Sequence, residues 1–291
     1  MLGNKMKADP PATPVAYGTG TAWFKSADAG FNHAAVDAIL MALSLGYRHI
    51  DGAQMYNTEA EIGHAIKESN IARSNIFLTT KTVDLEDVEA ALEASLEKLN
   101  TSYVDLYLIH SPFAAKSREQ LQAAWHGMEQ CLRRGLARNI GLSNFAVVHI
   151  QTILQTAVVT PAVNQIELHP YLRQPGLLDF LRSQNIAVQA VATLTPLTKM
   201  AGCSVCQECK RLAAKYGVSE SSVLLRWAID QGALPVTTSR KRDRLQQYIT
   251  DIPKFHLTSD EIQSINQAAG DKYFREFFAE EFRTLDAQNE H

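Results

Sequence analysis

The chain has 291 residues and a net charge of −3, with 46% hydrophobic and 20% charged residues. These values are typical of a globular protein with a large core, and they give no reason to expect nucleic acid or an anionic membrane as a partner. The sequence contains no apolar run long enough to cross a bilayer, so no membrane span is predicted.

Residues 1–14 are rich in Lys, Ala and Pro and have no apolar centre. We therefore expect a loose, disordered leader rather than a secretory signal, and a cytoplasmic protein. Residues 15–291 are expected to form a single domain that ends in a C-terminal tail.

Short apolar segments alternate with helical segments along the chain. Strands are expected at 15–22, 47–50, 75–80, 103–109, 138–142, 162–168, 186–192 and 233–236. Helices are expected at 34–45, 58–68, 84–99, 118–133, 147–156, 176–184, 206–216, 219–231, 242–248 and 259–269, followed by a Phe-rich tail at 273–282. This alternation predicts an α/β fold, with a parallel sheet closed into a (β/α)8 TIM barrel.

An open, doubly wound sheet is the alternative fold. It would require a Gly-rich fingerprint after the first strand, at the start of a helix. The stretch Gly18-Thr19-Gly20-Thr21-Ala22-Trp23 has two of the glycines but Trp where the third belongs, and no helix begins there. The barrel is therefore favoured.

The stretch 46–63 combines a strand, a loop and the start of a helix. The strand runs into Asp51, and Tyr56 follows in the loop. Thr58, with Glu61 three residues later, has the pattern of a capping box that begins the helix 58–68. An acid and a phenol are thus expected at the exit of a strand, where barrel enzymes place their active sites.

Two further polar residues end the next two strands: Lys81 ends the third and His110 ends the fourth. In a barrel, these side chains would converge with Asp51 and Tyr56 at the carboxyl end of the sheet. A neighbouring ammonium lowers the pKa of a phenol, and an aspartate holds that ammonium by an ion pair. A histidine at this place can orient a substrate oxygen. This chemistry fits reduction of a carbonyl by hydride, which a cofactor must supply.

The motifs GYRHIDGAQMYNTEAEIG at 46–63, LYLIHSP at 106–112, IGLSNF at 140–145 and NQIELHP at 164–170 resemble the aldo-keto reductase superfamily. The resemblance covers nearly the whole chain. It implies a (β/α)8 barrel that binds NADPH, with Asp51, Tyr56, Lys81 and His110 as catalytic residues and Tyr56 as proton donor. LPVTTSRKRDRL at 234–245 and FREFFAEEF at 274–282 are similar to the fungal branch of conjugated polyketone and α-keto amide reductases.

The resemblance also implies a set of cofactor contacts. Ser143, Asn144 and Gln165 match residues that hold the nicotinamide carboxamide in the family. Two positions depart from the family pattern: Val191 replaces a stacking aromatic ring, and Thr238 replaces a lysine that pairs with the 2′-phosphate. The remaining expected contacts are Ala192, Leu194, Thr237, Ser239, Arg240, Arg244 and Gln247.

The expected substrate pocket is lined by Trp23, Met55, Ser111 and Phe113. Ser111 stands where a tryptophan often follows the catalytic histidine, and the loops after Lys81 and His110 are short. These features indicate an open mouth that accepts bulky ketones, dicarbonyls or α-keto esters as well as aldehydes. In the tail, Tyr273 or Phe274 is expected near this pocket.

The sequence thus predicts a monomeric, NADPH-dependent carbonyl reductase with a small-molecule substrate and no metal. Two alternatives stay open. One is a cofactor-binding subunit that reports redox state to a partner, and the other is an alcohol or polyol dehydrogenase working in the oxidative direction.

Three of the four cysteines, Cys203, Cys206 and Cys209, are spaced three residues apart. Such spacing occurs in metal and iron–sulfur sites, but no fourth ligand lies nearby, since Cys131 is far off in sequence. Oxidation-sensitive thiols near a cofactor-covering loop, or an ordinary helix face, are the favoured interpretations.

Overall fold

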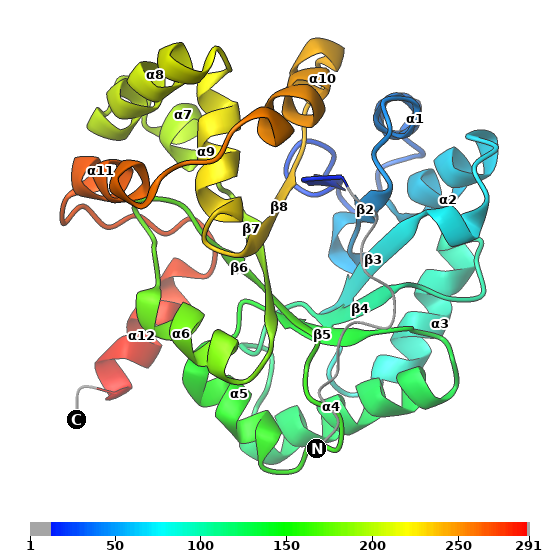
Figure 1. Cartoon of the computed structure of the whole chain (residues 1–291). Coiled ribbons are helices and arrows are strands. Elements are labelled where there is room, and N and C mark those ends of the chain that lie inside the picture. The colour runs from blue at the N-terminus through cyan, green and yellow to red at the C-terminus, as the bar shows by residue number, and fades with distance from the viewer. Residues whose placement is uncertain (1–12, 290–291) are drawn as a thin grey trace.

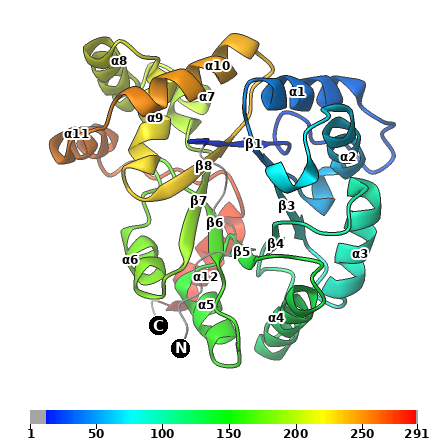
Figure 2. The same cartoon turned by 45° about the vertical axis from the view of Figure 1, so that its right-hand side comes forward.

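The structure, a computed structural model, describes residues 13–289. Eight parallel strands form a closed barrel in chain order, and helices surround it (Figures 1 and 2). The predicted barrel is confirmed, and the open sheet is wrong. Residues 1–12 of the predicted leader lie outside the described residues, so the disordered leader stays a prediction.

The strands are β1 Ala16–Gly18, β2 His49–Asp51, β3 Phe77–Thr82, β4 Leu106–Ile109, β5 Ile140–Ser143, β6 Val163–Glu167, β7 Ala187–Val191 and β8 Ala233–Thr237. The barrel closes where β1 pairs with β8, with Ala16 opposite Val236. The first strand is shorter than the expected 15–22, because the chain turns after Gly18: the N–H of Trp23 donates to the carbonyl of Gly20.

The helices are α1 His33–Ser44, α2 Glu59–Glu68, α3 Val88–Leu99, α4 Arg118–Arg133, α5 Val147–Leu154, α6 Pro175–Ser183, α7 Thr195–Lys199, α8 Ser204–Tyr216, α9 Glu220–Ile229, α10 Arg242–Asp251, α11 Ser259–Ala269 and α12 Ala279–Asn289, with 3-10 turns η1 Gln54–Tyr56, η2 Arg73–Asn75 and η3 Ile252–Lys254. Two of these, α7 and α12, were not expected from the sequence. In the described part of the chain, no helix is long and apolar enough to span a membrane.

Strand β4 shows how the sequence encodes a barrel. All four of its residues are fully buried, as expected for a parallel strand covered on both faces. Tyr107 and Ile109 belong to the large core cluster that the outer helices complete. Leu106 and Leu108 belong to a separate small cluster that also contains Phe77 of β3. Alternate residues therefore face opposite sides of the sheet, because strand side chains have a period of two.

The predicted capping box at the start of α2 is wrong. Thr58 is the N-cap residue, but its side chain makes no capping hydrogen bond and donates instead to Thr19 Oγ1, 3.2 Å away. Glu61 is fully buried and accepts from Lys25 Nζ at 2.5 Å and from the N–H of Asn32 at 2.7 Å. Both side chains thus serve tertiary contacts that fix the loop after β1.

Candidate active site

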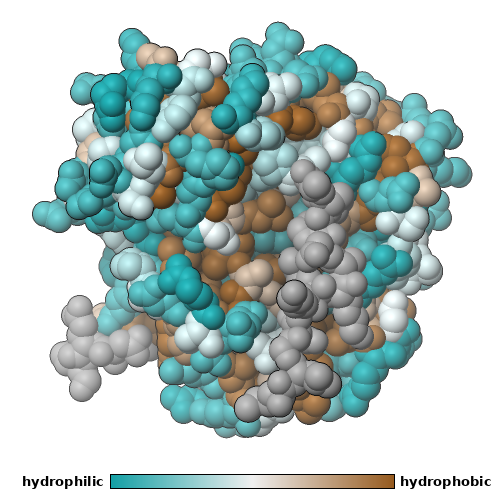
Figure 3. Space-filling view, viewed as in Figure 1, coloured by the Kyte–Doolittle hydropathy of each residue, from teal (hydrophilic) through white to brown (hydrophobic). Residues whose placement is uncertain are grey.

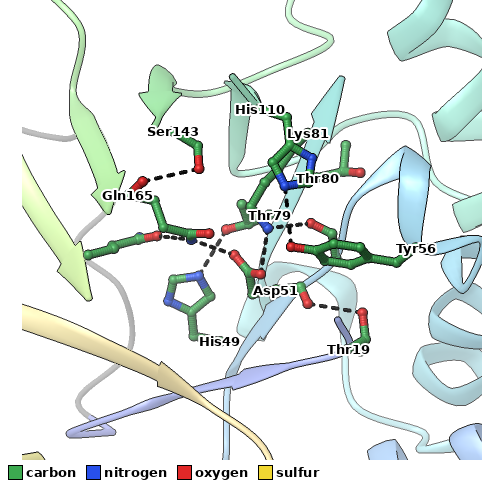
Figure 4. A network of polar contacts seen from close by, with 12 residues as sticks. Thr19, His49, Asp51, Tyr56, Thr79, Thr80, Lys81, His110, Ser143 and Gln165 are labelled. Carbon is green, nitrogen blue, oxygen red and sulfur yellow. Dashed lines mark hydrogen bonds and ion pairs between the residues drawn. The ribbon is translucent and has the colours of Figure 1, made fainter. Parts of the chain in front are cut away.

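The four predicted catalytic side chains converge at the carboxyl ends of β2, β3 and β4 (Figure 4). Asp51 is the last residue of β2, and its Oδ1 lies 2.6 Å from Lys81 Nζ. Tyr56 ends the 3-10 turn η1, and its Oη lies 3.4 Å from His110 Nε2. The Lys81 ammonium lies 5.0 Å from the centre of the Tyr56 ring. Each of the four side chains therefore lies close to at least one other member of the cluster.

The charges in this cluster are set by burial and by the ion pair. Burial raises the pKa of Tyr56, and the Lys81 ammonium opposes that rise without reversing it. The lowering of the Tyr56 pKa that the sequence predicts is therefore not found. Burial would lower the pKa of Lys81, but the Asp51 carboxylate outweighs burial and raises it. Burial and Lys81 together lower the pKa of His110 to about 3. At neutral pH the site holds a neutral phenol, a neutral imidazole and an ion pair.

The free energy of unfolding is expected to fall as the pH drops from about 6.5 to about 5, by roughly 1–2 kcal/mol for each deeply buried histidine. Burial lowers the pKa of His49 to about 4, and that of His110 is about 3. Both values lie below the 6.5 of the unfolded chain, so the unfolded state binds the extra protons. The contribution of these histidines to the free energy of unfolding is therefore fully present above pH 6.5, and it decreases as the pH falls below that value.

Urea unfolding at a series of pH values measures this loss. Carboxylates of ordinary pKa stay ionised in both states over this interval, so the change reports the histidines. In His49→Gln, the pH-dependent loss should shrink by the share of one buried histidine, because glutamine binds no proton over this interval. A free energy that stays flat down to about pH 5 would contradict protected neutral histidines.

Sequence reasoning missed the residues after β1 that support this cluster. Gly20 lies against the Tyr56 ring: a Cβ placed there would be 3.0 Å from the ring carbon that carries the hydroxyl. Thr19 Oγ1 donates to the Asp51 carbonyl at 3.1 Å. The small-residue run YGTGTA predicts a strand, but in the structure its glycine lets the backbone approach a side chain closely.

The predicted nicotinamide contacts lie at the end of β5 and in the middle of β6, across the barrel from Tyr56. The Asn144 Nδ2 donates to the His110 carbonyl at 3.0 Å and to Ser143 Oγ at 3.0 Å. Ser143 Oγ donates to the Gln165 carbonyl at 3.1 Å. The Gln165 amide donates to Asp51 Oδ2 at 2.8 Å, which links this group directly to the catalytic cluster (Figure 4). The structure thus brings both predicted groups into one network.

The other predicted cofactor residues follow β7 and β8. Val191 ends β7, and Ala192 has a φ of 57°, a left-handed conformation that costs energy for a residue with a Cβ. Leu194 then leads into α7. At β8, Thr237 is the last strand residue, and Thr238 and Ser239 follow it; Ser239 Oγ accepts from the N–H of Lys241 at 3.0 Å.

The two predicted arginines near β8, Arg240 and Arg244, lie in different environments. The Arg240 guanidinium lies 4.8 Å over the Trp23 ring and donates to the Ala22 carbonyl at 2.6 Å, so it joins β8 to the loop after β1. Arg244 and Gln247 are exposed on α10. The helix begins at Arg242, and its N-cap residue, Lys241, makes no side-chain capping hydrogen bond. This leaves a basic helix start, a usual environment for a phosphate.

The predicted pocket residues are not equally available to a substrate. Trp23 is buried and donates from Nε1 to Tyr17 Oη at 3.0 Å. Ser111 is buried and its Oγ accepts from the N–H of Phe113 at 3.2 Å. Met55 is exposed, and Phe113 is half-buried. Met55 and Phe113 are therefore the most accessible of the four, and the substrate pocket stays a prediction.

The aromatic residues of the tail that approach this surface are not the expected ones. Tyr273 is 64% exposed, and the Phe274 ring lies 6.1 Å from His169 rather than near Phe113. Instead, Phe278 and Phe282 lie 5.5 and 5.0 Å from the Phe113 ring. On the face of the molecule shown in Figure 3, apolar residues gather near the middle and polar residues cover the outer helices.

A buried carboxylate at the end of β6 holds the tail in this place. Glu167 is 1% exposed and accepts from the N–H of Glu276 at 2.9 Å and from the N–H of Phe277 at 2.9 Å. His169 Nε2 lies 2.9 Å from the same carboxylate. We call this arrangement the tail latch. It joins the C-terminal segment to the strand next to the one that carries Ser143.

Three comparisons with known proteins agree with this geometry. The profile of the aldo/keto reductase family matches residues 16–269. An NAD/NADP-dependent indole-3-acetaldehyde reductase of Schizosaccharomyces pombe is 38% identical over 272 residues, which are 92% of this chain and 95% of that protein. An NADPH-dependent α-keto amide reductase of Saccharomyces cerevisiae is 41% identical over 280 residues, which are 91% of this chain and 88% of that protein.

Solved structures give the same result. A Bombyx mori aldo-keto reductase, crystallised in complex with NADP, superposes with a TM-score of 0.80 and 33% identity over 91% of each chain. Fold and site together define a TIM-barrel oxidoreductase that acts on carbonyl groups with NAD(P)H. The chain belongs to the aldo/keto reductase family, and the similarity to its fungal branch is confirmed by the two yeast relatives.

Proposed function

We propose that this protein reduces ketones and aldehydes with NADPH, with Tyr56 as the proton donor. The observation that supports this best is the position of the Tyr56 hydroxyl, 3.4 Å from His110 Nε2 and beside the buried Lys81–Asp51 pair. A neutral phenol next to an ammonium has a proton to give and a charge beside it that stabilises the phenolate left behind. A monomeric, cytoplasmic enzyme stays the prediction.

Each side chain of the cluster has a separate task in this proposal. When bound, NADPH supplies the hydride that adds to the carbonyl carbon. Tyr56 and His110 Nε2 hydrogen-bond the carbonyl oxygen and fix its orientation. As negative charge develops on that oxygen, Tyr56 transfers its proton to it, and Lys81 stabilises the phenolate. Asp51 keeps Lys81 charged and in place.

The residues at β5 to β8 fit a nicotinamide dinucleotide. Ser143, Asn144 and Gln165 provide buried hydroxyl and amide groups beside the catalytic cluster, suited to a carboxamide. The Thr193 hydroxyl is buried and finds no hydrogen-bond partner within residues 13–289, so a polar ligand group could satisfy it. The basic start of α10 supports a 2′-phosphate, which favours NADPH over NADH, although Thr238 stands where the family has a lysine.

Bulky ketones, dicarbonyls and α-keto esters are the proposed substrate class. Ser111 presents no large ring next to His110, and it is buried. The surface left beside the site is aromatic, formed by Phe113 with Phe278 and Phe282. Such a surface binds extended apolar groups better than it binds a polyhydroxylated sugar chain. The Saccharomyces cerevisiae relative is an α-keto amide reductase, which supports the same substrate class.

The test is NADPH consumption with four substrates: an aromatic aldehyde, a cyclic dicarbonyl, an α-keto ester and an aldose, each repeated with NADH. We expect the dicarbonyl and the keto ester to react at least as efficiently as the aldehyde, and the aldose to react poorly. Good reduction of small aldehydes, with every bulky ketone inert, would contradict the open site.

The same experiment addresses the two alternatives. Tight binding of NADPH without turnover of any carbonyl would favour a cofactor-binding subunit that reports redox state. Faster turnover of an alcohol with NADP⁺ than of the matching carbonyl with NADPH would favour an oxidative role.

A further inference from the structure

Cys203 and Cys206 lie side by side at the start of α8, outside the proposed catalytic cluster. Their sulfur atoms are 2.7 Å apart, and both cysteines are free thiols. Cys203 is the N-cap residue of α8, and its Sγ accepts from the N–H of Cys206 at 3.3 Å. Residues three apart at a helix start lie within the spacing that a disulfide requires. The pair can therefore close without unfolding the helix.

The two thiols differ in the way that a reactive pair requires. Cys203 is half-buried, so a small molecule can reach it, whereas Cys206 is buried beneath it. Burial raises the pKa of Cys203, but hydrogen bonds from Cys206 and Tyr171 outweigh burial and hold it below the ordinary value. The pKa of Cys206 is raised, chiefly by burial. A helix N-terminus also stabilises a thiolate at the cap position.

The third cysteine of the cluster does not take part. Cys209 is fully buried on the next turn of α8, and burial raises the pKa of its thiol. No group of three or more His, Cys, Asp or Glu residues that could hold a metal occurs within residues 13–289. The structure therefore separates an accessible pair from a core cysteine.

We propose that Cys203 and Cys206 form a reversible redox site that reacts with low-molecular-weight disulfides. The Cys203 thiolate attacks one sulfur of the small disulfide, whose S–S bond breaks and releases one thiolate. Cys206 then attacks Cys203 Sγ, and the 203–206 bond forms as the second thiolate leaves. Two protein thiols are oxidised, the small disulfide is reduced to two thiols, and the two cysteine protons pass to the leaving thiolates.

Closure of this pair changes the contacts of α7. Cys206 Sγ lies 3.2 Å from the Pro196 carbonyl oxygen and 3.6 Å from the Met200 carbonyl oxygen, and Cys203 Sγ lies 3.8 Å from the Pro196 oxygen, so the single S–H of Cys206 has both carbonyls within reach. A disulfide has no S–H, so the Cys206 donor is lost and the Pro196 carbonyl is left facing sulfur. The segment 194–200 is then held less firmly.

This segment continues directly from the proposed cofactor residues at the end of β7. The N–H of Thr195 donates to the carbonyl of Ala192 at 2.9 Å, and Lys199 pairs with Glu276 of the tail at 3.0 Å. Loosening of α7 would therefore weaken cofactor binding. This second step rests on the proposed function, whereas the thiol chemistry does not.

The chemistry is tested with glutathione disulfide and mass spectrometry of the intact chain and its peptides. We expect loss of two hydrogens, a crosslink between Cys203 and Cys206, and reversal by dithiothreitol. Cys206→Ser should stop at a stable glutathione adduct on Cys203, and Cys203→Ser should not react at this helix. Cys209→Ser is the matched control and should react like the original chain. Equal reaction in Cys203→Ser, or no crosslink in the original chain, would overturn the proposal.

The effect on α7 is read by hydrogen exchange without any cofactor. Amides of residues 194–203 should exchange faster in the oxidised form, and unchanged exchange would refute the coupling. NADPH titration then tests the last step, with an affinity expected to fall about 3- to 10-fold, the size of one or two lost hydrogen bonds. If the reduced protein bound no NADPH, the proposed function would fail, but the redox pair and its exchange signature would stand.

Discussion

Tyr56→Phe is expected to lower the turnover of every carbonyl substrate by roughly 10²–10⁴-fold, the usual contribution of a positioned general acid. Phenylalanine keeps the ring that packs edge-on against His110, 5.4 Å between centroids, and that fills the space beside Gly20. It removes only the hydroxyl. NADPH affinity, measured by fluorescence titration, should therefore change little while kcat falls.

Tyr107→Phe is the matched control for this loss. Tyr107 is also fully buried, and its hydroxyl donates to the Val88 carbonyl at 2.9 Å, outside the catalytic cluster. Its removal should cost about 1 kcal/mol of stability and leave kcat unchanged. Retention of more than about a tenth of the turnover in Tyr56→Phe would show that another group supplies the proton.

Asp51→Asn is expected to destabilise the fold by about 3–5 kcal/mol, because it leaves a charged lysine buried without its counter-ion. Lys81 is fully buried, and its ammonium is held by Asp51 at 2.6 Å and by the Gly52 carbonyl at 2.8 Å. Turnover should fall as well, since the position of Lys81 beside Tyr56 depends on this pair. Urea unfolding and kcat measure the two effects separately.

The double variant Asp51→Asn with Lys81→Met separates charge burial from catalysis. Removal of both charges should restore most of the lost stability, because a neutral pair costs little to bury, while turnover stays low. Lys116→Met breaks a surface pair with 79% and 74% exposed side chains, and should change stability by less than about 1 kcal/mol. If the double variant were no more stable than Asp51→Asn, the unpaired charge would not be the cause of the loss.

The barrel and the convergence of the catalytic cluster could be predicted from sequence, because both depend on local and repetitive signals. Apolar strand segments such as 103–109 alternate with helices, and polar residues stand at the strand ends. Parallel strands in a barrel place all those ends on one side. The topology of the barrel is therefore enough to predict that Asp51, Lys81 and His110 lie close together.

Features that depend on a partner far away in sequence could not be predicted. Thr58 and Glu61 have the local pattern of a capping box. In the structure, however, Thr58 hydrogen-bonds Thr19 and Glu61 pairs with Lys25 instead. Helix propensity and capping are weak compared with burial of a paired carboxylate. The stacking of Arg240 on Trp23 could not be predicted either, because neither local sequence indicates the other residue as its partner.

The attachment of the C-terminal tail could not be predicted either, because it depends on Glu167, which is far away in sequence. The tail latch binds backbone N–H groups of residues 276 and 277, which every residue except proline possesses. These two latch hydrogen bonds therefore do not depend on which side chains residues 276 and 277 carry, whereas the Lys199–Glu276 ion pair does. Phe278 and Phe282 face Phe113 from this fixed backbone, so they can be exchanged without releasing the segment. If the Phe113 surface binds substrate as proposed, a library at positions 278 and 282 should vary substrate choice while the two latch hydrogen bonds are kept.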